Sequence, residues 1–402
     1  MNPKETLAQV RAIQAWIIGL RRRLHQKPEL KFQEVETNQL VCETLNQLSI
    51  PYRSPIAKTG IVAWIGKGTK PCVALRADMD ALPIQEESDV PFRSEVDGRM
   101  HACGHDCHTA MLLGAARILK ENESQLPGVV KLLFQPAEED GAGGEKMCQE
   151  GALESPEVQR IFGIHVWPWL STGSITGRSG TFLAATSNLR IILRGQGGHA
   201  AMPHRTIDPI VTGGKLIVEL QTLISRELDP LKPGVVSITA VNGGEAFNVI
   251  PPTVELKGTI RAMTLKDLRW LQARVSEVAE HITKANRCEA TLHFPGHDCP
   301  PTVNEVHCWN LAKQLSSDLL GSEHVTESPP IMGGEDFAYY LQKVPGCFLG
   351  LGVGNEGIGA TYSLHHPCFK VDEDALSIGT TLHVMFAFHS LRDLAKNNCA
   401  YC

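Results

Sequence analysis

One eight-residue segment, His101-Ala-Cys-Gly-His-Asp-Cys-His108, is rich in side chains that bind metals. It holds three histidines, two cysteines and one aspartate between a loop and the expected start of a helix. Thiolate and neutral imidazole are the ligands that zinc-like metals prefer. Gly104 lets the backbone turn, so that Cys103 and His105 could face one ion. The segment favours a metal site, although a polar loop with a capped helix would use the same residue types.

A second candidate segment, Phe134-Gln-Pro-Ala-Glu-Glu-Asp140, follows directly after an expected buried strand. Adjacent residues at the end of a strand point in different directions, so Glu138 and Glu139 need not have the same role. One carboxylate can bind a metal while its neighbour acts as a general base. Taken alone, the segment also fits a solvated acidic loop.

Two single histidines complete the set of candidate ligands. His165 follows the apolar run Ile161 to Ile164, and His365 lies in a loop after the expected strand Cys347 to Val353. A lone histidine at a strand end is more often structural than a ligand. Open α/β sheets, however, bind ligands at the carboxyl ends of their strands, and all the candidate segments fall at that edge. Their shared position therefore favours one common site.

The surrounding pattern predicts an α/β fold, with a mixed sheet that carries helices on both faces. Short apolar runs alternate with helical segments, which is typical of a covered sheet. The expected helices cover Lys4 to Gln26, Thr109 to Glu121 and Ala375 to Ala395. The expected strands are Gly60 to Ile65, Cys72 to Ala77, Val129 to Phe134, Ile161 to Val166 and Cys347 to Val353.

The middle of the chain has a different order, which predicts an inserted domain. Its elements follow a βαββαβ order, the split arrangement of a ferredoxin-like α+β domain. They are Asn188 to Arg194, Ile207 to Leu228, Val235 to Val241, Val254 to Ile260, a helix that Thr264 opens with Asp267 as its capping-box partner, and Cys288 to Phe294. We therefore expect residues 183–295 to form a satellite domain, and residues 1–182 and 296–402 to form the catalytic domain.

Composition narrows the classes of function. Of the 402 residues, 43% are hydrophobic and 20% are charged, as in ordinary globular proteins. The formal net charge of -6 gives no sign of a nucleic-acid or membrane partner. Because no long apolar run or secretory signal is found, a cytoplasmic location is expected. The 12 cysteines are scattered over a long chain, which favours reduced thiols, and the Cys399/Cys402 pair lies outside any βαβ context.

The chain resembles the M20 metallopeptidase family. Within it, the chain is similar to the amidohydrolases that include plant auxin-conjugate hydrolases, bacterial hippurate hydrolases and aminoacylases. The resemblance spans nearly the whole chain in order. It rests on Arg21-Arg-Arg-Leu-His-Gln-Lys-Pro-Glu-Leu30, Leu75-Arg-Ala-Asp-Met-Asp-Ala-Leu-Pro-Ile84, Met100-His-Ala-Cys-Gly-His-Asp106, Gln135-Pro-Ala-Glu-Glu139, Gly197-Gly-His-Ala-Ala-Met-Pro-His204, Asn248-Val-Ile-Pro251, Gly258-Thr-Ile-Arg261, Met332-Gly-Gly-Glu-Asp-Phe337 and His365-His-Pro367.

The resemblance implies a zinc-exopeptidase-like fold and a centre of two divalent metal ions, manganese or zinc. The ligands that it implies are Cys103, His105, Glu139, His165 and His365. Glu138 would be the catalytic base. Asp78 and Asp80 lie in the segment that supports the metal site in relatives.

The resemblance also assigns roles to residues of the inserted domain. His199 would reach the active site, often from the partner subunit of a homodimer, and its imidazole suits an oxyanion donor. Asn248 and Arg261 would hold the carboxylate of the substrate. By sequence alone, Arg261 also fits a surface charge on a strand. A monomer with closing domains is kept as an alternative to the homodimer.

The implied reaction is metal-dependent hydrolysis of the amide bond in N-acyl amino acids, such as indole-3-acetyl-, benzoyl- or acetyl-amino acids. It releases the free carboxylic acid and the amino acid. Two alternatives are kept: a dipeptidase or aminopeptidase-type metallo-exopeptidase with the same site, and a non-catalytic metal-binding or peptide-binding protein.

Two positions depart from the family pattern. Cys107 stands where relatives usually carry a small residue, and His366 replaces the usual Ser or Asn. Either could add a metal ligand or only change the surroundings of the site.

Overall fold

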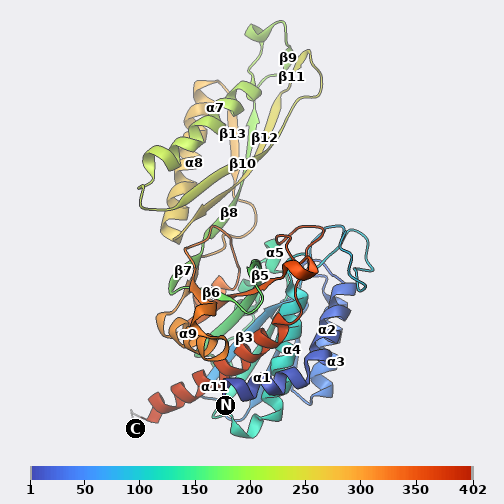
Figure 1. Cartoon of the computed structure of the whole chain (residues 1–402). Coiled ribbons are helices and arrows are strands. Elements are labelled where there is room, and N and C mark those ends of the chain that lie inside the picture. Colours follow the sequence, from blue (N-terminus) through green and yellow to red (C-terminus); the bar gives the residue numbers. More distant parts are fainter. Residues whose placement is uncertain (1, 400–402) are drawn as a thin grey trace. The chain divides into compact units, whose positions relative to one another are not determined.

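The computed structural model of the chain describes residues 2–399 (Figure 1), apart from the side chains of residues 397–399. The side chains of Cys399 and Cys402 therefore lie outside the described part. The chain forms two compact units. The first unit combines the residues up to Phe182, Val303–Pro329 and the residues from Asp336 onward. The second unit combines Leu183–Thr302 and Pro330–Glu335.

The first unit is built on an 8-stranded mixed sheet with the order β1-β2-β4-β3-β5-β16-β6-β15. Its strands are β1 (Tyr52–Ile56), β2 (Gly60–Gly66), β3 (Cys72–Asp78), β4 (Val129–Gln135), β5 (Arg160–Ser171), β6 (Ile175–Gly177), β15 (Val325–Glu327) and β16 (Gly346–Gly354). Within this order, β4, β3, β5 and β16 pair in parallel. Their carboxyl ends therefore meet at one edge, as the sequence predicts.

Helices cover both faces of this sheet. They are α1 (Pro3–Ala12), α2 (Gln14–Gln26), α3 (Val35–Gln47), α4 (His105–Glu121), α6 (Gly143–Gln149), α9 (Val306–Leu320), α10 (Ala338–Leu341) and α11 (Ala375–Cys399). Phe162 and Ile164 of β5 point into the main core with apolar residues of α4 and α11. Gly163 between them points to the other face, where a Cβ would meet the rings of Phe337 and Phe348 at 3.0 Å. The predicted α/β class is confirmed.

The second unit has the predicted βαββαβ order. Its elements are β8 (Ala185–Arg194), α7 (Pro209–Thr222), β10 (Gly234–Asn242), β12 (Thr253–Ala262), α8 (Leu265–Ala285) and β13 (Glu289–His293). The sheet order is β10-β12-β8-β13, with antiparallel neighbours throughout. Thr264 caps α8 as expected, because its hydroxyl accepts from the Asp267 N–H at 3.0 Å. This unit is a ferredoxin-like α+β domain.

Several short elements complete the fold. Two short pairs are β9 (Gly198–His199) with β11 (Val249–Ile250), and β7 (Gly180–Leu183) with β14 (Thr302–Asn304). The turn α5 (Glu138–Gly141) is irregular, because Glu139 and Asp140 leave the helical conformation. A π-helical turn, Leu223–Glu227, follows α7. Within residues 2–399, no helix combines the length and the apolar character that crossing a membrane requires.

Three differences from the predicted boundaries have a clear physical cause. The single helix expected from Lys4 to Gln26 is divided at Ile13, which leaves the helical conformation while its side chain stays in the core. Because the apolar spacing continues across Ile13, the pattern alone could not show the break. Helix α4 begins at His105 rather than Thr109, directly after Gly104 adopts a left-handed φ of 88°. Strand β5 continues past the predicted end at Val166 to Ser171. Its pairing with β3 ends at Gly163, but its pairing with β16 continues to Ser171.

A buried carboxyl group in the first unit gives a prediction about stability. Glu34 has no exposed surface and accepts hydrogen bonds from the Ala137 N–H at 2.9 Å and the Thr59 hydroxyl at 2.5 Å. Burial raises the pKa of Glu34 from 4.5 to about 7, with a further contribution from Asp80. Between these two pH values the folded state binds more protons than the unfolded state. The stability that Glu34 contributes is therefore present below pH 4.5 and is lost as the pH rises through about 7.

We expect Glu34→Gln to remove this pH dependence. The amide can keep accepting from Ala137 and can donate to the Thr59 hydroxyl, and it does not ionise. Between pH 5 and pH 8, the urea midpoint of the variant should rise relative to that of the wild type. The corresponding change in the difference between their unfolding free energies is at most about 3 kcal/mol. The exposed neighbour Glu36→Gln serves as the control. Parallel pH profiles for wild type and Glu34→Gln would contradict the prediction.

Candidate metal centre

The predicted ligand segments meet at the carboxyl edge of the parallel strands. Glu138 and Glu139 follow β4, His165 lies on β5, and His105 opens α4. The His365 N–H donates to the Ala102 carbonyl at 2.8 Å, which holds the late loop against the segment before α4. Residues that are far apart in sequence thus converge because their strands are neighbours in one sheet.

Five predicted ligands form overlapping groups of candidate metal-binding atoms. Each group has its ligand atoms within 4.8 Å of one another. Three groups hold the predicted ligands: Cys103 with His105 and His165, Cys103 with Glu139 and His365, and His105 with Glu138 and Glu139. Two further groups are Asp78 with His105 and His108, and Glu138 with Glu335 and Asp336. The Cys103 Sγ lies 3.4 Å from the His165 Nε2, and the His365 Nε2 lies 3.1 Å from the Glu139 Oε1. The geometry therefore joins all five residues, with Glu138 beside them.

The two buried histidines, His105 and His165, both turn their Nε2 atom toward this cluster. The His105 Nδ1 lies 2.9 Å from the Asp80 carbonyl oxygen, and the His165 Nδ1 lies 2.8 Å from the Val166 carbonyl oxygen. A carbonyl only accepts, so each Nδ1 must carry a proton, and each Nε2 is the nitrogen left to bind a metal. The His105 Nε2 is buried and makes no hydrogen bond. This is the arrangement in which imidazole binds a metal.

The segment that carries the two glutamates is fixed by Asp80. Its Oδ1 accepts from the Glu138 N–H and its Oδ2 from the Glu139 N–H, each at 3.0 Å. The turn is compact, since a Cβ at Gly143 would lie 1.7 Å from the Pro136 carbonyl oxygen. Ala137 and Asp140 adopt positive φ angles of 53° and 59°, a conformation that costs energy for residues other than glycine. Asp80 therefore orients both glutamates, which motif reading alone does not specify.

A buried ion network lies behind the cluster. The Arg76 guanidinium donates to the Asp78 Oδ2 at 2.7 Å and to the Asp336 Oδ1 at 2.8 Å. The Gln135 amide also donates to Asp336. These contacts tie the ends of β3 and β4 to the segment before α10. No role was predicted for Arg76, Gln135 or Asp336, although all three lie within the motifs that carry the family resemblance.

The electrostatics of the cluster favour a cation. Burial and the Glu139 and Glu138 carboxylates all raise the pKa of the Cys103 thiol well above its usual value. Burial alone would lower the pKa of His105, but Asp78 and Asp80 raise it to about 10. The pKa of His165 is well below its usual value because of burial and nearby His108. A divalent cation is the charge that would stabilise the thiolate among these carboxylates.

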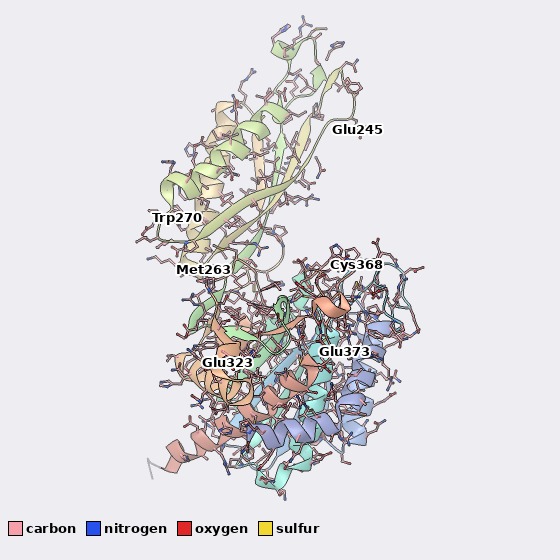
Figure 2. The ribbon with its side chains drawn as sticks, viewed as in Figure 1. Glu245, Met263, Trp270, Glu323, Cys368 and Glu373 are labelled. Carbon is pink, nitrogen blue, oxygen red and sulfur yellow. The ribbon has the colours of Figure 1, made fainter. Side chains whose placement is uncertain are left out.

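The two departures from the family pattern do not join the cluster. Cys107 is buried, and its thiol interacts electrostatically with Arg21. Arg21 also pairs with Asp106 at 2.7 Å and with Glu373 at 3.3 Å, and Glu373 is labelled in Figure 2. His366 is exposed and its ring stacks on Tyr362 with 4.4 Å between centroids. Neither residue belongs to a candidate metal-binding group among the described residues.

His199, Asn248 and Arg261 belong to the second unit. His199 lies on β9, which pairs with β11, and the Asn248 carbonyl accepts from the Ala200 N–H at 2.9 Å. These two residues are therefore neighbours, at the end of the unit where Figure 1 labels β9 and β11. Arg261 lies near the other end of β12 and donates to the Met332 carbonyl at 2.6 Å.

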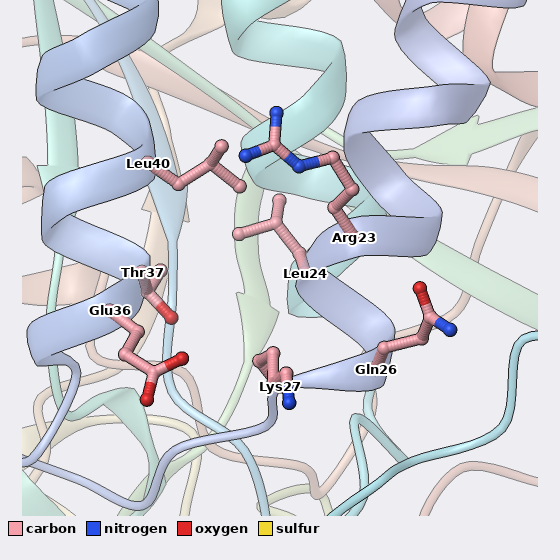
Figure 3. A pocket seen from close by; sticks show the side chains of 7 residues that line it. All are labelled: Arg23, Leu24, Gln26, Lys27, Glu36, Thr37 and Leu40. Carbon is pink, nitrogen blue, oxygen red and sulfur yellow. The ribbon is translucent and has the colours of Figure 1, made fainter.

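A separate hollow lies between α2 and α3 (Figure 3). It has a volume of 280 Å³ and is lined by Arg23, Leu24, Gln26, Lys27, Glu36, Thr37 and Leu40. None of the predicted ligands lines it, so it is distinct from the candidate metal centre.

Comparisons with known proteins agree with this geometry. Residues 74–389 match the profile of peptidase family M20/M25/M40. IAA-amino acid hydrolase ILR1-like 4 of Arabidopsis thaliana is 45% identical over 97% of this chain and 89% of the relative. N-acetyl-L-cysteine deacetylase of Bacillus subtilis is 39% identical over 95% of this chain and 89% of the relative. A crystal structure of a dinuclear metal binding peptidase of the M20 family from Bacillus subtilis is 36% identical, with a TM-score of 0.80 over 95% of this chain and 99% of that one.

Proposed function

The chain belongs to the M20 peptidase family, and on this basis we propose that it is a metal-dependent amidohydrolase of N-acyl amino acids. The reaction adds water across the amide bond and releases a carboxylic acid and a free amino acid. The observation that carries the proposal is the convergence of Cys103, His105, Glu139, His165 and His365 beside a second carboxylate, Glu138. Relatives named as IAA-amino acid hydrolase and N-acetyl-L-cysteine deacetylase support this substrate class.

The donor set fits two divalent metal ions. One group of ligand atoms consists of the His105 Nε2, which makes no hydrogen bond, with the Cys103 Sγ and the His165 Nε2. Glu139 and His365 supply another group. When bound, such ions supply positive charge that polarises the amide carbonyl and makes water more acidic. The Cys103 thiolate favours zinc, whereas carboxylate oxygens also suit manganese.

Glu138 is the proposed general base. One of its oxygens lies within 4.8 Å of ligand atoms of His105 and Glu139, and its main chain is held by Asp80. It would take a proton from the attacking water and deliver that proton to the nitrogen of the leaving amine. The C–N bond then breaks with a neutral amine as the leaving group. Both transfers require the carboxylate to stay free of direct metal binding.

The second unit would bind the rest of the substrate. The imidazole of His199 can donate to the oxyanion that forms from the amide carbonyl. Asn248 and the guanidinium of Arg261 can hold a free α-carboxylate, and Arg261 can do so with two parallel hydrogen bonds. A requirement for that carboxylate would explain a preference for N-acyl amino acids over simple amides.

The positions of these residues within the second unit support a homodimer. In the β8/β12 pair, Thr253 lies opposite Arg194 and Arg261 lies opposite Thr186. Arg261 lies eight positions after Thr253 along the strand, which is roughly 26 Å at about 3.3 Å per residue. His199 lies beyond the Thr253 end. A small substrate cannot span this distance, so two copies of the unit must contribute if all three residues bind one substrate. We propose residues 183–295 as the domain that mediates this dimer.

A hydrolysis screen tests the proposed function. Metal-stripped protein is supplied with Zn²⁺, Mn²⁺ or Co²⁺ and given indole-3-acetyl-, benzoyl- and acetyl-amino acids, with unblocked dipeptides alongside. We expect metal-dependent release of free amino acid from the N-acyl compounds. Faster cleavage of dipeptides would instead support the metallo-exopeptidase alternative, and no cleavage with any metal would reject both.

Replacement of Cys103 tests the ligand assignment. Cys103→Ser exchanges a soft thiolate for a hydroxyl, so metal affinity and activity should fall together. Loss of a residue that only orients a ligand weakens binding by about 10- to 100-fold, and loss of the ligand itself should exceed that range. Metal content after dialysis, measured by mass spectrometry, and the hydrolysis rate check this.

Cys107→Ser is the matched control. Cys107 is equally close in sequence to His105, but it contacts Arg21 rather than the cluster. Its replacement should leave metal content close to that of the wild type. Unchanged metal content in Cys103→Ser would show that Cys103 is structural.

A further inference from the structure

We propose that His108 is a positioning residue of the metal centre, which uses both ring nitrogens to hold Asp78 and the main chain next to His165. The inference rests on the metal site of the proposed function. In this inference His108 supports the metal site without being a metal ligand or the general base.

Both nitrogens of His108 are already engaged. The Nδ1 lies 2.5 Å from the Asp78 Oδ1, and the Nε2 accepts from the Val166 N–H at 2.9 Å. Because the Val166 N–H only donates, the Nε2 must be the acceptor and the Nδ1 must carry the proton. The ring is 1% exposed, so water does not compete for either contact. His108 therefore has no lone pair left for a metal, although it lies only three residues after His105.

The Val166 contact bears directly on the orientation of His165. The same residue that donates to His108 accepts, through its carbonyl oxygen, from the His165 Nδ1 at 2.8 Å. The rings of His108 and His165 also meet, with 4.6 Å between centroids. The His165 Nε2 is thereby directed at the Cys103 Sγ, 3.4 Å away. Without His108, the Val166 N–H would be buried without a partner, and the strand would have to shift to satisfy it.

The Asp78 contact protects the other histidine ligand. One Asp78 oxygen is held by His108, and the other accepts from Arg76 at 2.7 Å. That second oxygen lies 3.7 Å from the unpaired His105 Nε2. A small rotation of the carboxylate would bring this oxygen into the space in front of the nitrogen, where a metal ion would bind. The Thr109 hydroxyl, which donates to the Asp78 carbonyl at 2.8 Å, adds a third restraint from the same helix turn.

Three replacements separate the two contacts of His108. His108→Asn places an amide N–H near the former Nδ1, so it can keep the contact with Asp78 and loses the acceptor for Val166. His108→Gln places an amide oxygen near the former Nε2, so it can keep the acceptor for Val166 and loses the donor to Asp78. His108→Ala loses both contacts.

The matched control is His383→Gln. His383 lies on α11, is also 1% exposed, and contacts the ring of Phe162. Its two ring nitrogens make no hydrogen bond, and it belongs to none of the candidate metal-binding groups. It therefore controls for the loss of a buried imidazole from the same core.

The measurements are the dissociation constant for Zn²⁺, by competition with a chelator, and the visible spectrum of the Co²⁺-loaded protein. The urea midpoint of the metal-free protein is measured as well. We expect His108→Ala to weaken Zn²⁺ binding by about 10- to 100-fold and to shift the Co²⁺ bands. His108→Asn and His108→Gln should each lose less affinity than His108→Ala. His383→Gln should bind Zn²⁺ like the wild type, even if its metal-free form is less stable.

The inference is overturned if the His108 variants bind Zn²⁺ with wild-type affinity and keep the wild-type Co²⁺ spectrum. It is also overturned if His383→Gln loses as much affinity as they do, because the effect would then follow general destabilisation. Should His108→Ala fail to fold, the Asn and Gln variants decide the question, since each retains one contact. Failure of the wild-type protein to bind two divalent ions would instead reject the proposed function itself.

Discussion

Glu138→Gln should lower the turnover number by roughly 10²- to 10⁴-fold, the contribution typical of a positioned general acid–base group, and should leave both metal ions bound. An amide of the same shape cannot take a proton from water. The metal ligands would be unaffected, because the proposed carboxylate ligand is the neighbouring Glu139. Metal content by mass spectrometry and the hydrolysis rate of the best N-acyl amino acid from the screen check both halves of this expectation.

Glu139→Gln gives the contrast that makes the result specific. Glu139 contacts His365 at 3.1 Å and shares a ligand group with Cys103, so its replacement should reduce metal content and activity together. Wild-type turnover in Glu138→Gln would reject its role as the base. Loss of metal from Glu138→Gln would show that the two glutamates have been assigned in the wrong order.

His199→Ala should lower the turnover number by on the order of 10²- to 10³-fold, as expected for removal of one oxyanion donor. Metal content should stay the same, because His199 lies in the second unit and in none of the candidate ligand groups. The neighbouring exposed His204→Ala is a suitable control, since His204 carries no proposed role. Equal losses in His199→Ala and His204→Ala would point to a general disturbance of this end of the unit.

Mixing two inactive variants tests whether His199 acts on the partner chain. If it does, His199→Ala mixed with Glu138→Gln should recover activity, because one site of a mixed dimer carries both intact residues. Exchange of subunits must first be shown by mass spectrometry of the mixed dimers. Confirmed exchange without recovered activity would favour a site completed within one chain, in which His199 and Arg261 do not both bind one substrate.

Much of the fold could be predicted because its signals are local. Apolar runs bounded by turn residues predicted β2, β3, β4 and β16, and the order of elements predicted the ferredoxin-like unit. Helices α3 and α9 were missed, although their apolar spacing was present in the sequence. The break at Ile13 and the extension of β5 could not be seen, because each depends on packing or pairing with distant segments.

The sequence by itself determined which residue types are available for chemistry and where they stand along the chain. Cys103 and His105 stand on either side of Gly104, Glu138 and Glu139 follow a strand, and His165 and His365 lie near other strands. Their chemistry as candidate metal ligands follows from residue type and short-range spacing, which the chain carries before it folds.

Only the tertiary structure decided which atoms face one another. Parallel pairing of β4, β3, β5 and β16 brings the candidate ligands to one edge. The Nδ1 atoms of His105 and His165 donate to the carbonyls of Asp80 and Val166, which leaves their Nε2 atoms for a metal. Cys107 interacts with Arg21 rather than with the cluster. These outcomes depend on strand register and on hydrogen-bond and ion-pair partners, several of which come from distant segments. A motif specifies neither, because the partners of its side chains are set by the packing of the whole unit.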